Sequence, residues 1–177
     1  MKRYFMMRQD KTLSYAIQLR DFDVCGKSHL FHKSDAERLN DTTILYLSSK
    51  GGEAVWDFIQ SPVNMVSEMG RHVLSMYEDN LLFKKVSLIH KEKEQELLYY
   101  QVLMDEIEGL SARVERYPDQ TEKKILLDIG KIGEHKVFLL ADSRIKAPIV
   151  HMDVVESMLR RNSIGVLFQE VEVDCGE

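Results

Sequence analysis

The sequence has few cysteines, no long apolar run and no excess of positive charge. Its longest apolar runs are short, such as Val137 to Ala141, so we expect no segment that spans a membrane. Its two cysteines, Cys25 and Cys175, lie in polar surroundings far apart in the chain. This favours a reduced pair over a disulfide. Since no apolar segment follows Met1-Lys2-Arg3, we expect no signal peptide and a cytoplasmic protein.

The usual sequence signatures of catalysis are also missing. Ser67 could form a nucleophile–base pair with His72 or His151, but no G-x-S-x-G motif surrounds it, and a helix-capping role explains it sufficiently. Gly51-Gly52 and Gly130 lack the context of a phosphate-binding loop and are interpreted as turns. We therefore predict a protein that is not an enzyme and binds no cofactor.

One cluster has metal-binding residue types. Cys25, His29 and His32 form a C-x3-H-x2-H pattern. Zinc requires about four ligands in a tetrahedral arrangement, and no second cysteine or histidine pair completes the set. We interpret the three residues as ordinary loop residues and predict no metal site, while metal binding by them stays the open alternative.

The net charge is −5, and it is unevenly distributed. Residues 1–60 contain nine basic and eight acidic side chains, whereas residues 61–177 contain 15 basic and 21 acidic ones. Non-specific nucleic-acid binding needs cations that displace phosphate counterions, so this acidic part argues against it. The same charge would suit a basic protein partner.

Length and pattern predict an α+β protein with a mostly antiparallel sheet and two or three helices. The 177 residues favour residues 57–177 as the main domain, with residues 1–56 as strands and an irregular segment of the same fold. Ser67 and Asp153 are predicted helix N-caps, and a helical turn is expected at 34–39. Strands are predicted at 4–8, 13–19, 42–48, 81–89, 97–104, 124–129, 136–140 and 166–173.

The chain shows a possible internal duplication. Pro62 and Pro148 are 86 residues apart, as are Ser67 and Asp153, and Phe83 and Phe168 are 85 apart. Each phenylalanine is followed by two polar residues and a valine. We predict two helix–strand units of one design; chance is the alternative, because an amphipathic helix followed by a strand is common.

Trp56, the only tryptophan, lies between Glu53 and Asp57. Tryptophan is enriched in interface hot spots, so we predict that Trp56, Glu53 and Asp57 belong to a partner-binding surface. The alternative is that Trp56 is a core residue, as large aromatic side chains often are.

Several short motifs resemble, in their order, a bacterial immunity-protein family of polymorphic-toxin gene clusters, first catalogued as a domain of unknown function. These motifs cover about residues 57–173, and the second helix start departs from them, with His151-Met152-Asp153 where V-S-E is typical. They are P-x-x-x-V-S-E at 62–68, L-L-F-K-K-V at 81–86, Leu98-Tyr99-Tyr100, Leu110-Ser111, Ile125 to Leu127, Val137-Phe138-Leu139 and Gly165 to Phe168.

This resemblance implies a cytoplasmic protein that binds a cognate toxin and neutralises it by occlusion, without catalytic residues of its own. The acidic charge of residues 61–177 favours a basic toxin. The alternative is a non-catalytic structural or self-associating domain, such as a homodimer formed through an exposed strand edge.

Overall fold

We describe the fold from a computed structural model, in which residues 2–12, 32–48 and 55–174 are described. Within these residues the strands form two sheets, one of six strands and one of five. Six strand pairs are antiparallel and three are parallel. The α+β class with mostly antiparallel pairing is therefore confirmed, although the strands form two sheets instead of one. No helix in the described ranges is long and apolar enough to cross a membrane.

The six-stranded sheet contains both ends of the described chain. Its order is β7 (Glu106–Ile107), β9 (Val137–Leu140), β10 (Ile149–His151), β1 (Tyr4–Gln9), β11 (Val166–Asp174) and β8 (Leu126–Asp128). The five-stranded sheet is formed by the middle of the chain. Its order is β2 (Thr42–Tyr46), β5 (Leu82–His90), β6 (Gln95–Leu103), β4 (Met65–Val66) and β3 (Phe58–Ile59).

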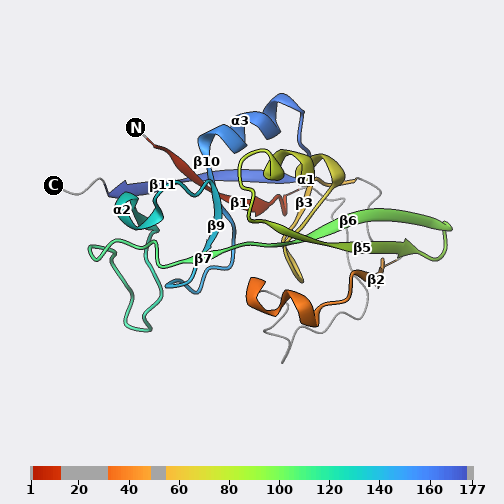
Figure 1. Cartoon of the computed structure of the whole chain (residues 1–177), viewed down its shortest axis with the longest axis horizontal. Coiled ribbons are helices and arrows are strands. Elements are labelled where there is room, and N and C mark those ends of the chain that lie inside the picture. Colours follow the sequence, from red (N-terminus) through yellow and green to blue (C-terminus); the bar gives the residue numbers. More distant parts are fainter. Residues whose placement is uncertain (1, 13–31, 49–54, 175–177) are drawn as a thin grey trace.

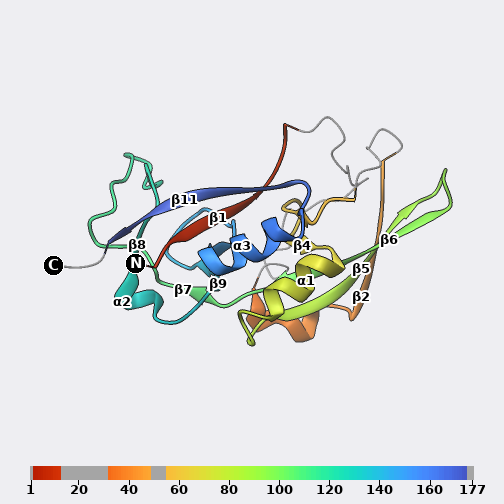
Figure 2. The same ribbon diagram turned by 90° about the horizontal axis from the view of Figure 1, so that it is seen from above.

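The helices are few and short. They are the 3-10 helix η2 (Lys33–Arg38) and the α-helices α1 (Glu68–Ser75), α2 (Ile129–Ile132) and α3 (Met152–Arg160). Figure 1 shows α1 and α3 above the sheets, η2 below them, and the β5–β6 hairpin projecting from the body. Seen from above in Figure 2, α1 and α3 lie side by side.

The two sheets share one arrangement. In each, a short strand leads into a helix and the helix into a nine-residue strand, as β4–α1–β5 and as β10–α3–β11. A central strand, β6 or β1, lies between the short and the long strand and is antiparallel to both. A parallel strand, β2 or β8, flanks each long strand, and an antiparallel strand, β3 or β9, flanks each short one. This arrangement supports the predicted internal duplication.

A shared core joins the two units. One cluster of buried side chains combines residues of both sheets with the inner faces of α1 and α3. It includes Met7, Phe58, Val66, Val73, Leu74, Tyr100, Val102, Val137, Val150, Val154 and Met158. Burying apolar side chains contributes about 1.5–3 kcal/mol each, so this cluster is the main stabilising contact between the units.

The two long helices begin differently. The Ser67 hydroxyl accepts a hydrogen bond from the Gly70 amide at 3.2 Å, so the predicted cap of α1 is confirmed. The predicted cap at Asp153 is wrong, because His151 precedes α3 and its Nδ1 accepts from the Asp153 amide at 3.2 Å. Asp153 lies in the first helical turn, where a hydrogen bond from Lys136 lowers the pKa of its carboxyl.

Candidate functional site

The Trp56 side chain does not lie on the surface, so its predicted role as a partner-binding anchor is corrected. Its exposed fraction is 0%, and its ring covers Gly165 at the start of β11. A Cβ atom at Gly165 would lie only 2.5 Å from Cγ of Trp56, which is closer than real atoms pack. Trp56 is therefore a core residue, the alternative that the sequence left open. Glu53, its predicted neighbour in the site, lies outside the described residues.

Asp57 also has a structural role, because its hydrogen bonds join three segments of the chain. Its Oδ1 accepts a hydrogen bond from the Ser67 hydroxyl at 2.6 Å, and its Oδ2 accepts one from the Ile164 amide at 2.7 Å. Its own amide donates to the Ile164 carbonyl at 2.8 Å. The carboxylate thus ties the start of α1 to the turn between α3 and β11, and both of its oxygens already have donors.

The group of Cys25, His29 and His32 is only partly within the described residues, because Cys25 and His29 fall outside them. His32 is described, and its Nδ1 lies 2.5 Å from Oε1 of Glu106. Beside it, Lys33 donates to Asp105 at 2.7 Å. No group of three or more potential metal ligands is present in the parts of the chain that the structure describes. The two pairs fasten η2 to the segment that follows β6.

These pairs border an open pocket of about 570 Å³. Its lining residues are His32, Lys33, Ser34, Leu82, Met104, Asp105 and Glu106. A histidine oriented by a carboxylate is half of a general-base arrangement. Ser67, whose sequence context indicated a helix cap and not a nucleophile, caps α1 and donates to Asp57. His151, one of the two histidines considered as its base, caps α3.

A different surface has the features of a binding site: the distal half of the β2–β5–β6 sheet. The register places Ile44 opposite Ser87 and Ser87 opposite Leu98, so these three residues form one row across one face. Two residues further along each strand, Tyr46, Ile89 and Glu96 form the next row on that face. The exposed fractions are 56% for Ile44, 40% for Tyr46 and 47% for Leu98. We call these two rows the open face.

Only one half of this sheet face is covered by a helix. At the covered end, the Arg71 guanidinium of α1 lies 4.8 Å from the ring centroid of Tyr100. A hydrogen bond to Glu68 raises the pKa of the Tyr100 phenol. The first turn of α1 lies on Tyr100 and the helix continues toward the Leu103 end of β6, so it covers Tyr100 but leaves Leu98 exposed. The distal half of β6 is therefore covered on one side only.

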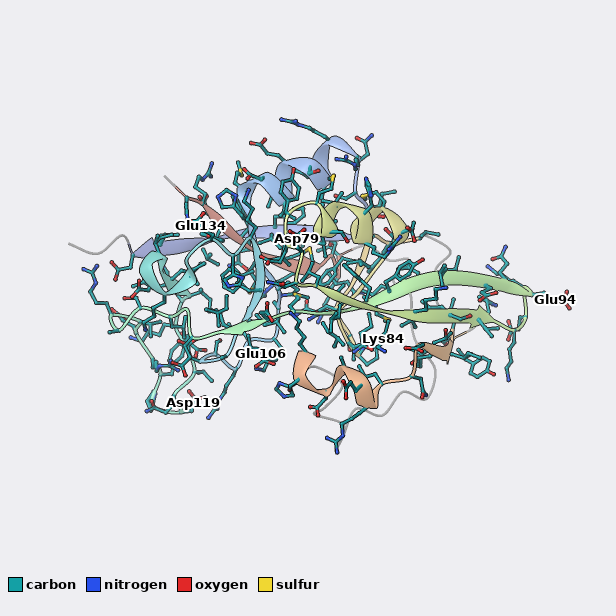
Figure 3. All side chains as sticks on the ribbon, in the orientation of Figure 1. Asp79, Lys84, Glu94, Glu106, Asp119 and Glu134 are labelled. Carbon is teal, nitrogen blue, oxygen red and sulfur yellow. The ribbon has the colours of Figure 1, made fainter. Side chains whose placement is uncertain are left out.

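Polar and charged side chains lie between and beside the exposed apolar residues of the open face, and Ser87, between Ile44 and Leu98, is buried. The Lys91 ammonium lies 4.3 Å from the ring centroid of Tyr46, and the Ser87 hydroxyl donates to Glu96 at 2.6 Å. Figure 3 places Glu94 at the tip of the projecting hairpin. An apolar centre with a charged, exposed rim is the usual anatomy of a protein-binding surface.

The sequence contains a signal for the open face in the last strand of the β5–β6 hairpin. Leu97 to Met104 is apolar on both sides of the strand, which indicated only burial. The same pattern arises where one side packs inward and the other binds a partner. Comparisons with known proteins do not decide between these uses: no protein-family model matches the chain, and no curated protein is significantly similar to it.

Proposed function

We propose that this protein is an immunity protein that binds a cognate toxin and blocks it by occlusion, with the open face as its contact surface. The observation that carries the proposal is that three exposed apolar side chains, Ile44, Tyr46 and Leu98, lie on one face of this sheet. Exposed apolar residues that gather on one rimmed face are typical of interaction sites.

The support for this face is preformed, as inhibition by occlusion requires. β5 and β6 pair along nine residues each, and the opposite side of the hairpin is buried through Val86, Leu88 and Tyr99. The Tyr99 phenol also donates to the Trp56 carbonyl at 2.8 Å, which anchors β6 to the core. A surface that is already ordered loses little conformational entropy on binding.

The charge of the chain favours a basic partner. Net charge is −5, and the hairpin tip carries three exposed carboxylates, Glu92, Glu94 and Glu96, against two exposed lysines, Lys91 and Lys93, so it is slightly acidic as well. Complementary charge accelerates association and excludes partners of like charge. A basic toxin, such as one that acts on nucleic acid, would be attracted to this rim. The protein would act as a cytoplasmic inhibitor and would need no catalytic residue or cofactor.

Affinity capture of the tagged chain from its own cells tests this proposal. The expected result is one tight partner that arrests growth when it is expressed alone and is neutralised when the two proteins are co-expressed. Leu98→Lys should weaken that binding by roughly tenfold or more, since it places a charge in the apolar centre.

Leu167→Lys is the matched control, because Leu167 is exposed to nearly the same extent, 46%, but lies on β11 of the other sheet. It should leave binding unchanged. If the chain captures no growth-arresting protein, the immunity function is wrong. If both variants weaken capture equally, the open face is not the contact surface.

A further inference from the structure

We propose that a pocket on the six-stranded sheet binds a small apolar carboxylate, and that Arg8 holds the carboxylate group. The proposal does not depend on the immunity function. The pocket, here named the β1–β11 pocket, has a volume of about 360 Å³ and lies between β1, β11 and residues 122–125, with Ile145 beside it. It is on the face of the sheet opposite α3, which Figure 1 shows above β1 and β11. Small-molecule sites typically have volumes of roughly 300–1,000 Å³, so this pocket is large enough for a ligand of several carbon atoms.

The floor of the β1–β11 pocket is apolar. Met6, Ile125 and Val171 line it, and all three are buried members of one core cluster. Their positions are therefore fixed by packing before any ligand arrives. A ligand group that displaces water from such a floor gains hydrophobic free energy without the cost of ordering a protein segment. The floor thus favours a ligand with an aliphatic group.

The charged side chains that line the pocket are paired, with one exception. Each of its three carboxylates lies within 3.1 Å of a basic group. The pairs are Glu122–Arg116 at 2.8 Å, Glu170–Arg3 at 2.7 Å and Glu172–Lys124 at 3.1 Å. Lys123, a further lining cation, pairs with Glu115 at 3.0 Å. These charges cancel in pairs, which leaves the positive charge of Arg8.

Arg8 is exposed and has no carboxylate partner in the described part of the chain. Its Nε donates to Sδ of Met6 at 3.4 Å, which places the guanidinium beside the apolar floor. A thioether is a weak acceptor, so this contact leaves the guanidinium available for a stronger one. The planar guanidinium binds a carboxylate through two parallel hydrogen bonds. A phosphate group, with a charge of about −1.5 to −2, would need more cations than this one.

The equivalent position in the other unit shows that the fold does not require a cation here. The matching strand pairs before the two helix caps are Val66–Tyr100 and Val150–Phe5. Three residues further along the central strand lie Leu103 in β6 and Arg8 in β1. Leu103 is 1% exposed, whereas Arg8 is exposed. An unpaired arginine at a position that holds a buried leucine in the other unit is explained by a ligand and not by packing.

Gln169 determines which carboxylates fit best. It is opposite Met6 in the β1–β11 register, so its side chain is on the same face as the pocket, and it is exposed. Its amide can both donate to and accept from a peptide group that adjoins the ligand carboxylate. The last residue of a peptide with an aliphatic side chain offers all three features. A free aliphatic acid offers the carboxylate and the aliphatic group.

Two-dimensional NMR titration of the full chain with hexanoate tests the proposal. Saturable shifts should appear at the amides of Met6, Gln169 and Val171, with a dissociation constant roughly in the millimolar range for so small a ligand. Acetate, which lacks the aliphatic group, and hexanamide, which lacks the charge, should each bind about tenfold more weakly. Tighter binding of acetyl-alanyl-leucine than of hexanoate would identify peptide ends as the ligand, and the reverse order would identify free acids.

Arg8→Gln should weaken hexanoate binding by about tenfold or more, because glutamine lacks the charge that strengthens the hydrogen bonds. Arg8→Lys, which keeps the charge but not the fork of donors, should retain part of the affinity. Arg160→Gln is the matched control, since Arg160 is an exposed arginine of α3, on the opposite side of the sheet, and it should leave binding unchanged.

The native spectrum should be retained in the Arg8→Gln chain, because a substitution at an exposed position rarely unfolds a protein. A loss of binding then reports on the pocket itself. Two results would overturn the proposal: no saturable shift with either hexanoate or acetyl-alanyl-leucine, or equal affinity of the Arg8→Gln and unaltered chains.

Discussion

At the scale of single residues, the most informative contact is that between Trp56 and Gly165. Gly165 has φ +75°, a left-handed conformation that side chains with a Cβ atom rarely adopt, and the indole ring occupies the space where its Cβ would lie. The turn before β11 and the segment before β3 can approach only because this residue is glycine. The contact between Trp56 and Gly165 thus joins the two helix–strand units.

Gly165→Ala should therefore destabilise the fold by about 2–4 kcal/mol, the sum of the left-handed backbone cost and overpacking. Chemical denaturation followed by tryptophan fluorescence measures this directly, since Trp56 is the only tryptophan. Gly133→Ala is the control: Gly133 also has positive φ, but nothing lies within 4 Å of its Cβ position. It should destabilise the protein without altering the native Trp56 spectrum. An unchanged spectrum in both variants would contradict the contact.

The Asp57 carboxylate is a second residue on which the core depends. Asp57→Ala removes the acceptor of the Ser67 hydroxyl and of the Ile164 amide, and hydrogen bonds to charged groups contribute about 1.5–3 kcal/mol each. We expect a loss of about 2–4 kcal/mol in the free energy of unfolding, measured by urea denaturation. Asp79→Ala, at an exposed position after α1, should change it by less than about 0.5 kcal/mol. Equal effects would argue against the bridging role.

At the scale of elements, the sequence predicted the long strands and both main helices but not the short connecting pieces. The predicted internal duplication, with matching residues 86 apart, included β5 and β11. Nine-residue strands and eight- or nine-residue helices are long enough for their hydrophobic period to be recognised in the sequence. β4 and β10 have two and three residues, and α2 has four, which is too short for any period. Their structure is set by tertiary pairing.

The candidate site could not be predicted in the same way, because it depends on which part of the sheet a helix covers. The exposure of Leu98 follows from the start of α1 beside Tyr100, and the burial of Trp56 follows from Gly165, more than 100 residues later in the chain. The spacing of residues along the sequence does not show that α1 leaves Leu98 uncovered or that Gly165 lies against Trp56. The sequence therefore pointed to exposure of Trp56, which is buried, and to burial of Leu98, which is 47% exposed.

The central strands of the two sheets carry buried phenols with a testable pH dependence. Burial raises the pKa of Tyr4 in β1 to about 12 and raises that of Tyr99 in β6 further. A phenol in the unfolded chain titrates near pH 10. The stabilisation linked to these raised pKa values is fully present below about pH 10 and is lost as the pH rises toward the folded values.

The free energy of unfolding should therefore decrease between about pH 10 and pH 12, as measured by urea denaturation at each pH. Tyr4→Phe should make the decrease smaller. Tyr117→Phe should not, because Tyr117 is 52% exposed. A decrease of the same size in all three proteins would assign the alkaline sensitivity to other groups, such as Lys136, whose pKa is raised by its hydrogen bond to Asp153.

At the scale of the whole molecule, the two units do not divide the chain into an N-terminal and a C-terminal half. β1, from the start of the described chain, is the strand between β10 and β11, and it contributes Phe5 and Met7 to the core that also holds α1. The six-stranded sheet is therefore complete only when β1, near the start of the chain, pairs with β10 and β11 near its end. Both units should unfold together, since their helices share one cluster of buried side chains.

A chain that begins at Asp57 should consequently fail to fold, although residues 57–177 contain most of the strands. Without β1, the sheet edges of β10 and β11 lose their antiparallel partner, and the buried faces of Val150 and Val154 lose their cover. Amide dispersion in a two-dimensional NMR spectrum measures the result. Adding residues 1–56 as a separate chain should restore a folded complex, because the missing strand is held by pairing and not by chain connection. A well-dispersed spectrum from residues 57–177 alone would show instead that this part folds independently, with β1 as an addition to its sheet.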